Sequence, residues 1–279
     1  MTADALAEAY VHCGQIARVN ERDLWLAALF APAPLRPHLH ALAAFAHETG
    51  GVAARVREPL AGEMRLVWWR EALAGARPAE AAGAPIAAAV IDTMAKFTLP
   101  VSAFENWLQA LTFDVYDDAM ESLEALEGYG IATGGALIAL RARVLAEGHE
   151  TGARAATDAA GAGLVLTRAV LDFALGRRHP LLTPRALIER YGVSFAQARA
   201  GSGGDGLRAA LVELADAAAA RFDEAEAHLA ALPSALAPAF APLATARLDL
   251  KRWRRAAAPF APAAPWRRQW ALWLWARRR

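Results

Sequence analysis

Hydrophobic and polar positions follow a helical period along almost the whole chain. Apolar residues recur three and four positions apart, and β-branched residues never alternate with polar ones over the length of a strand. Alanine supplies much of the apolar content, and alanine has the highest helix propensity of the amino acids. The pattern therefore predicts an all-α protein, a single-domain bundle of long helices.

Proline and glycine divide this pattern into predicted elements. The predicted helices cover residues 3–17, 21–30, 34–57, 62–75, 85–97, 102–113, 117–148, 152–175, 207–231 and 236–257, with a short one starting at Pro184. Residues 76–85 are predicted to be a linker, and residues 200–206 a flexible loop. The third helix carries a double glycine, Gly50–Gly51. Each glycine costs about 1 kcal/mol relative to alanine in a helix interior, so the pair needs a physical reason.

Composition sets the domain organisation and excludes several classes of protein. Residues 1–257 are predicted to form one helical domain, and residues 258–279 a Pro/Ala linker with a basic, Trp-rich segment. Of the 279 residues, 56% are hydrophobic and 21% charged, which argues against disorder. The net charge of +1 gives no case for nucleic acid as a partner. The single cysteine, Cys13, excludes an intramolecular disulfide framework and a cysteine-based zinc site.

The sequence also limits the expected location. Its first residues have no basic stretch followed by an apolar core, so no secretory signal is expected. The longest uncharged run, residues 229–246, contains three prolines and little bulk, which argues against a membrane span. The predicted location is the cytoplasm. The alternative is a peripheral position on the inner face of the cytoplasmic membrane.

Paired carboxylates are the first candidate chemistry. Two carboxylates at i and i+4 share one helix face and could hold Mg²⁺ ions that bridge a diphosphate. Asp114/Asp118 and Asp117/Glu121 have this spacing. Their charge-dense surroundings favour a solvated helix start, where acidic side chains also suit the helix dipole.

Arg168 and Asp172 have the same spacing within an apolar helix. A charge buried there needs a partner, so an intrahelical ion pair lining the bundle is the favoured interpretation. The alternative is the remnant of a diphosphate or metal site. His47 has no second histidine at ligand spacing, so a zinc site is not expected.

Three stretches together resemble the squalene/phytoene synthase family, over roughly residues 15–195. They read "RDLWLAALFAP…ALAAFAHETGGVA…GEMRLVWWREAL", "LEGYGIATGGALIAL" and "AGAGLVLTRAVLDFALGRRHPLLTPRAL". The segment "RLVWW", with its upstream spacing, is the most specific of them. The resemblance implies the isoprenoid-synthase fold, with helices around a central cavity. In such a cavity the candidate ligand-binding residues are Arg22, Trp25, Asp114 and Tyr129.

The metal-binding positions of that family are depleted in this chain. The family places an Arg and a D-D-x-x-D motif in the first region, and Asn, Arg-Asp and further acids in the second. The matching positions here are His47, Gly50, Gly51, Ala54, Arg168, Leu171 and Asp172. Only Asp172 keeps a carboxylate, too few to bind two or three Mg²⁺ ions. We therefore expect a vestigial site with no catalytic residue, no metal and no cofactor.

This depletion resembles a degenerate branch of the family that includes a mitochondrial assembly factor for respiratory complex I. The resemblance implies a non-catalytic assembly or scaffold protein for NADH:quinone oxidoreductase at the membrane, with complex I subunits or assembly intermediates as partners. Such a protein could also bind an isoprenoid lipid in its cavity. The alternative is a Mg²⁺-dependent transferase that condenses farnesyl or geranylgeranyl diphosphate head to head, with other carboxylates replacing the missing ones.

The segment "WRRQWALWLWARRR", residues 266–279, combines four tryptophans with five arginines and no acidic residue. Tryptophan and arginine together suit the interface of an anionic membrane. The predicted membrane contacts are Trp266, Trp270, Trp273, Arg267 and Arg268. The alternative is a last helix that packs on the bundle and leaves its arginines in water.

Overall fold

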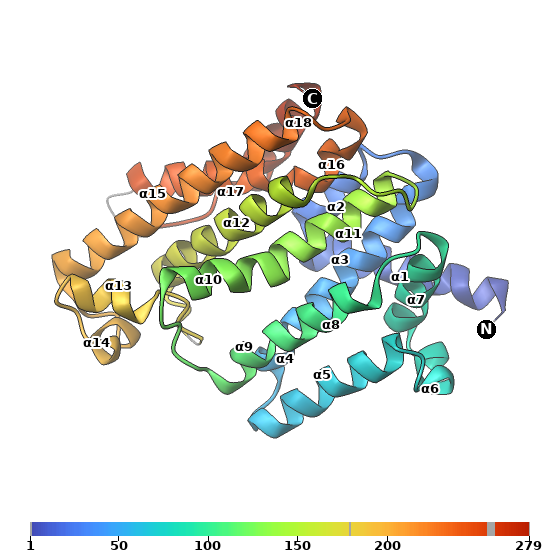
Figure 1. The fold of residues 1–279 in the computed structure, drawn as a ribbon, viewed down its shortest axis with the longest axis horizontal. Coiled ribbons are helices and arrows are strands. Elements are labelled where there is room, and N and C mark those ends of the chain that lie inside the picture. The colour runs from blue at the N-terminus through green and yellow to red at the C-terminus, as the bar shows by residue number, and fades with distance from the viewer. Residues whose placement is uncertain (1, 179, 256–259, 279) are drawn as a thin grey trace.

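Long helices packed side by side build the part of the chain that the computed structural model describes, residues 2–178, 180–255 and 260–278 (Figure 1). No strand is present in this part, so the all-α class predicted from the sequence is confirmed. Helix α12 (Arg154–Ala174) is central, because it packs against α15 (Gly204–Leu229) on one side and α10 (Leu123–Gly130) on another. The predicted boundary at residue 257 lies outside the described residues.

The elements follow the punctuation of the sequence. The remaining helices are α1 (Ala3–Asn20), α2 (Arg22–Ala28), α3 (Arg36–Gly50), α4 (Val52–Arg55), α5 (Pro59–Leu73), α6 (Pro78–Gly83), α7 (Pro85–Lys96), α8 (Val101–Ala110), α9 (Thr112–Tyr116), α11 (Ala136–Leu145), α13 (Arg185–Arg190), α14 (Phe195–Arg199), α16 (Ala237–Phe240), α17 (Pro242–Arg255) and α18 (Pro265–Arg278). A π-helical segment, Ile131–Gly135, joins α10 to α11. Proline stands in the first turn of α3, α5, α6 and α7, where its missing N–H costs nothing.

The predicted third helix is wrong at its double glycine. Helix α3 ends at Gly50, and Gly51 leaves the helical region with φ −88° and ψ 1° before α4 begins. The glycines therefore end a helix instead of interrupting one, and the interior cost of glycine does not apply to them.

The predicted helix over residues 117–148 is wrong at its start. Helix α9 ends at Tyr116, and Asp117 takes the left-handed conformation with φ 52°. Helix α10 begins only at Leu123, where the Ser122 side chain accepts the N–H of Ala125. The predicted linker over residues 76–85 contains the short helix α6, and helix α14 was not expected.

Glycine allows a very close contact between α12 and the π-helical segment. A Cβ atom on Gly161 of α12 would lie 2.4 Å from the backbone nitrogen of Gly135 and 2.5 Å from the carbonyl oxygen of Gly130. No side chain fits that space, so α12 and the π-helical segment touch backbone to backbone. Gly130 and Gly135 of the stretch "GYGIATGG" thus lie where the two helices touch.

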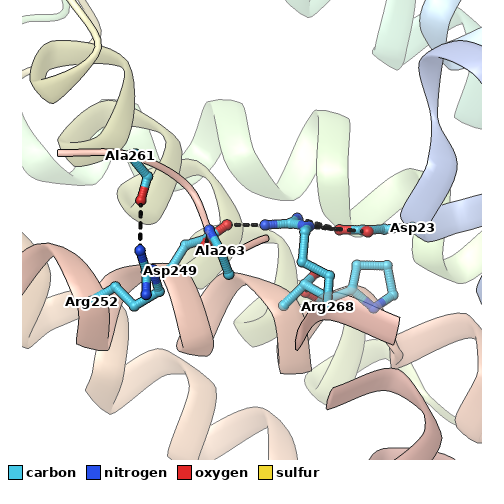
Figure 2. Close-up of polar contacts among 8 residues, drawn as sticks. Asp23, Asp249, Arg252, Ala261, Ala263 and Arg268 are labelled. Atoms are coloured by element: carbon cyan, nitrogen blue, oxygen red, sulfur yellow. Dashed lines mark hydrogen bonds and ion pairs between the residues drawn. The ribbon is translucent and has the colours of Figure 1, made fainter. Parts of the chain in front are cut away.

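Helix α18 is fixed to the bundle by a half-buried ion-pair network (Figure 2). The guanidinium group of Arg268 lies between two carboxylates, Asp23 of α2 and Asp249 of α17. Asp249 also accepts the backbone N–H of Ala263 at 2.7 Å. The side chain of Arg268, predicted as a membrane contact, is therefore occupied inside the structure, where it joins three helices.

A second polar network joins α1, α3 and α7. The Tyr10 hydroxyl lies 2.8 Å from Nδ1 of His38 and 2.6 Å from an Asp92 oxygen, to which it donates. His38 is buried, and its Nε2 lies 3.1 Å from the Lys96 ammonium group. Burial, and then the charge of Lys96, lower the pKa of His38 to about 4.

Acid should destabilise the fold through His38. The unfolded chain titrates near the ordinary histidine pKa of 6.5, so between pH 6.5 and 4 it binds more protons than the folded chain. The free energy of unfolding should therefore fall as pH falls through that window, by up to about 1.4 kcal/mol per unit of pKa difference. In urea unfolding at several pH values, His38→Gln should show a shallower acid slope. The exposed control His12→Gln should keep the wild-type slope.

Candidate functional site

The first vestigial region lies where α3 ends. His47 lies beside Glu21, the residue between α1 and α2, with 3.4 Å between Nδ1 and Oε1. A Cβ on Gly50 would meet no atom within 4 Å. A Cβ on Gly51 would lie 2.5 Å from a guanidinium nitrogen of Arg55 and 3.1 Å from the His47 carbonyl oxygen. All these atoms are local, so no neighbouring helix approaches at either glycine.

Arg55 occupies the space beside Gly51. Its guanidinium group donates to the backbone carbonyl of Glu48 and forms an ion pair with the Glu48 carboxylate at 3.2 Å. A cation thus sits at the end of α3, where the carbonyl groups carry partial negative charge. The sequence analysis did not identify Arg55 as part of this region. Its position four residues after Gly51, about one helical turn away, is the signal that could have predicted the contact.

The second region brings four predicted residues together. The Tyr129 hydroxyl donates to Oδ2 of Asp114 at 2.8 Å, and Nη2 of Arg168 lies 3.9 Å from that same oxygen. Nε of Arg168 donates to Oδ2 of Asp172 at 3.2 Å. Arg177, not singled out from the sequence, holds the other Asp172 oxygen at 2.8 Å. The spacing had predicted the Arg168–Asp172 pair; it had not predicted that Asp114 and Tyr129 join it.

Burial decides the protonation of this cluster. It raises the pKa of Asp114, while the Arg168 charge and the Tyr129 hydrogen bond pull that pKa down. Burial, and then the Asp114 charge, raise the pKa of Tyr129, so the phenol keeps its proton. Tyr129 therefore donates to Asp114, while Arg168 faces Asp114 as an ion-pair partner and donates its hydrogen bonds to Asp172 and Tyr129.

The other predicted carboxylate pairs do not form. Because α9 ends at Tyr116, Asp114 and Asp118 do not share a helix, and neither do Asp117 and Glu121. Asp117 instead forms an ion pair with Arg199 at 2.9 Å. Glu121 lies 3.9 Å from Arg185.

The residues do not fit a site for Mg²⁺. Within residues 2–178, 180–255 and 260–278, no three His, Cys, Asp or Glu side chains converge as a metal site would require. Asp114 keeps one buried oxygen, Oδ1, without a hydrogen-bond partner, but a single oxygen is not the ligand set of a magnesium ion. Leu171 and the three first-region positions Gly50, Gly51 and Ala54 offer no ligand side chain.

A groove of about 1120 Å³ opens beside this cluster. It runs between α8 and the α10–α11 rod and reaches the start of α12; Figure 1 shows α8 alongside this rod. Small side chains form much of its wall, namely Ala103, Ala110, Ala132, Ala136 and Ala139. Tyr129 lines the groove, and charged side chains such as Arg143 and Glu150 stand along it.

Asp114 accepts the hydrogen bond of Tyr129 but does not itself line the groove, and the other two candidate cavity residues lie elsewhere. Arg22 is exposed on α2, and Trp25 stacks on His40 with 6.1 Å between ring centroids. Neither residue lines the groove. The adjacent tryptophans Trp68 and Trp69 pack edge to face, and Trp69 is buried in the core.

Comparisons with known proteins agree with the fold and the family expected from the sequence. The family model described as squalene/phytoene synthase matches residues 17–273. No curated protein sequence matches the chain. The branch that resembles the complex I assembly factor stays a prediction.

Solved structures show the same fold at low sequence identity. The chain is similar to squalene synthase HpnC from Alicyclobacillus acidocaldarius, with 22% identity, 99% of this chain and 96% of that chain covered, and a TM-score of 0.67. It is similar to YisP from Bacillus subtilis subsp. subtilis strain 168, with 19% identity, 96% of each chain covered and a TM-score of 0.71. A dehydrosqualene synthase in complex with ligand has 16% identity, 98% and 97% coverage and a TM-score of 0.77. At these identities the likeness shows the fold alone.

Removing the charge of Arg168 should destabilise the fold. Arg168→Gln leaves the buried Asp114 carboxylate without its cation, which should cost about 1–3 kcal/mol at pH 7 because a buried charge is left uncompensated. Arg154→Gln, which breaks the exposed ion pair with Asp158 on the same helix, should cost less than about 0.5 kcal/mol.

Urea denaturation measures both costs. Asp114→Asn should restore most of the stability lost in Arg168→Gln, because the neutral amide still accepts the Tyr129 hydroxyl. Equal losses in the Arg168 and Arg154 variants, or no recovery in the double variant, would show that Asp114 does not depend on Arg168.

Proposed function

The chain belongs to the squalene/phytoene synthase family, and on that premise we propose that it is a non-catalytic member that binds an isoprenoid chain. The observation that carries the proposal is the use of arginine where the family uses acids and metal. Asp114 and Asp172 are held by arginines, and Arg55 fills the space beside Gly51. A cationic side chain already balances each acid, so these carboxylates have no free charge for a divalent ion.

The groove supports the ligand part of the proposal. Ligand pockets usually measure about 300–1,000 Å³ and are mostly apolar with a few polar groups. The groove is slightly larger, at about 1120 Å³, and its alanines leave a smooth apolar wall. A long, flexible hydrocarbon chain suits such a wall, because its burial is favourable and needs no directional contact. The Arg143 guanidinium, which pairs with the exposed Glu150 carboxylate along the groove, offers a polar contact for a head group.

The physiological role that we propose is assembly or scaffolding of respiratory complex I. This part rests on the sequence resemblance to the degenerate branch and on the depleted acids. Deletion of the gene in its host should lower the amount of assembled complex I on a native gel. The native-gel measurement tests the assembly role by itself, and its outcome does not depend on whether the groove binds an isoprenoid.

Filling the groove should abolish isoprenoid binding. Ala139→Phe places an aromatic ring in the groove from an exposed position on α11. Thermal shift with farnesol or a short-chain quinone should stabilise the wild type, with or without Mg²⁺, and should not stabilise this variant. Ala227→Phe, an equally exposed helical alanine on α15 away from the groove, is the matched control and should keep the shift. A shift that survives in Ala139→Phe would place the ligand elsewhere.

No prenyl transfer is expected. Incubation with Mg²⁺ and farnesyl or geranylgeranyl diphosphate should release no diphosphate. Restoring the first motif by Gly50→Asp, Gly51→Asp and Ala54→Asp should not give activity, because Leu171 remains and Asp172 remains paired to arginine. Mg²⁺-dependent diphosphate release by the wild type would refute the non-catalytic proposal, and a product that joins two prenyl chains would establish the head-to-head prenyltransferase, in line with the synthase names of two structural neighbours.

A further inference from the structure

Helix α18 has two chemically different faces. Its inner face packs into the core, where Leu272 is 1% exposed and Nε1 of Trp275 donates to the carbonyl oxygen of Ala237 at 3.1 Å. Arg268 adds its ion pairs to α2 and α17 on that side (Figure 2). The inner face therefore fixes both the position and the rotation of the helix.

The outer face carries an exposed row of tryptophans. Trp266, Trp270 and Trp273 are 63%, 56% and 37% exposed, and their i, i+4, i+7 spacing puts them on one side of the helix. The rings of Trp270 and Trp273 stack with 4.7 Å between centroids. We name these three side chains the tryptophan row. Large apolar side chains held together in water mark an interaction surface, since single exposed ones are ordinary but clusters are not.

Arginines accompany the tryptophan row. The Arg267 guanidinium lies 5.0 Å from the Trp266 ring centroid, and that of Arg277 lies 4.8 Å from the Trp273 centroid. Arg278 is also exposed, and α18 contains no acidic residue. The surface that meets this face must therefore accept indole rings and carry negative charge.

We propose that the outer face of α18 docks the protein on an anionic lipid bilayer, with the helix lying in the plane of the interface. Indole rings favour the boundary between head groups and acyl chains, because one edge is polar and the body is apolar. Arginines beside them attract anionic head groups. In the described part of the chain, no helix is long and apolar enough to cross a membrane, so this contact is peripheral.

The ion-pair network makes the docking face rigid. Many interfacial helices fold only when they reach the membrane, and ordering then costs affinity. Here Asp23 and Asp249 hold Arg268, so the tryptophan row already points outward before any lipid is present. This inference does not depend on isoprenoid binding, and either one can fail without the other.

Vesicle flotation tests the proposal with the full chain. Vesicles of phosphatidylcholine with about 30% phosphatidylglycerol imitate an anionic leaflet and should bind the wild type. Vesicles of pure phosphatidylcholine should bind it much less. The triple variant Trp266→Ala, Trp270→Ala, Trp273→Ala should lose at least about ten-fold in partition coefficient, because the apolar area is lost. Leu60→Ala with Met64→Ala, which removes equally exposed side chains from α5, should bind as the wild type does.

Variants of the exposed arginines test whether vesicle binding depends on positive charge. Arg267→Gln with Arg277→Gln should lower binding roughly five-fold per arginine at low salt, and added salt should remove the difference. Arg18→Gln with Arg57→Gln, two exposed arginines outside α18, should not change it. Circular dichroism should show the same melting temperature for all these variants, since the altered side chains are exposed.

Three results would overturn the proposal. They are wild-type protein that stays off anionic vesicles, equal binding to both vesicle types, and undiminished binding by the triple tryptophan variant. A triple variant that changes only the oligomeric state would assign the tryptophan row to a contact between two copies of the chain.

Discussion

The backbone contact at Gly161 sets the geometry on which the site depends. Because residues 130 and 135 meet α12 without side chains between them, the α10–α11 rod lies against the backbone of α12. Tyr129 precedes Gly130, and Arg168 lies two turns beyond Gly161, so this approach brings both to Asp114. The π-helical segment Ile131–Gly135 absorbs the local change in pitch, and the Thr133 hydroxyl donates to the Tyr129 carbonyl within it. One packing constraint thus places the polar cluster and forms a wall of the groove.

Arginine gives this fold an internal solution to a problem that divalent ions solve elsewhere. A carboxylate buried at a helix interface needs a positive partner, and a metal ion or a guanidinium group can supply it. In this chain Arg168 faces Asp114 and Asp172, and Arg177 completes the second pair. The consequence is chemical: a fixed guanidinium cannot leave with a diphosphate, exchange with solvent or bridge two phosphate groups as Mg²⁺ does. In the second region of this chain, the polar groups of Asp114, Tyr129, Arg168 and Asp172 are committed to one another.

The sequence predicts what depends on local periodicity and misses what depends on distant contacts. Helical period, proline positions and the Arg168–Asp172 spacing are local, and the structure agrees with them. The end of α3 at Gly50 was missed because a glycine pair has the same sequence signal inside a continuous helix as at the end of one. Arg141 was also missed: it is fully buried, donates to the carbonyls of Leu39 and Leu24, and has its pKa lowered to about 10 by burial. No pattern reveals such contacts, because they join segments more than 100 residues apart.

The side chains of helix α18 differ in their surroundings, although the sequence alone does not distinguish them. The arginines of "WRRQWALWLWARRR" look equivalent along the chain, yet rotation about the helix axis separates their roles. Arg268 faces inward and meets two acids, while Arg267, its neighbour in sequence, stays outside against Trp266. The tryptophans divide in the same way, since Trp275 is buried and Trp270 is not. The inner side chains fix the rotation of the helix, and that rotation decides which of its tryptophans and arginines a surface outside the protein can reach.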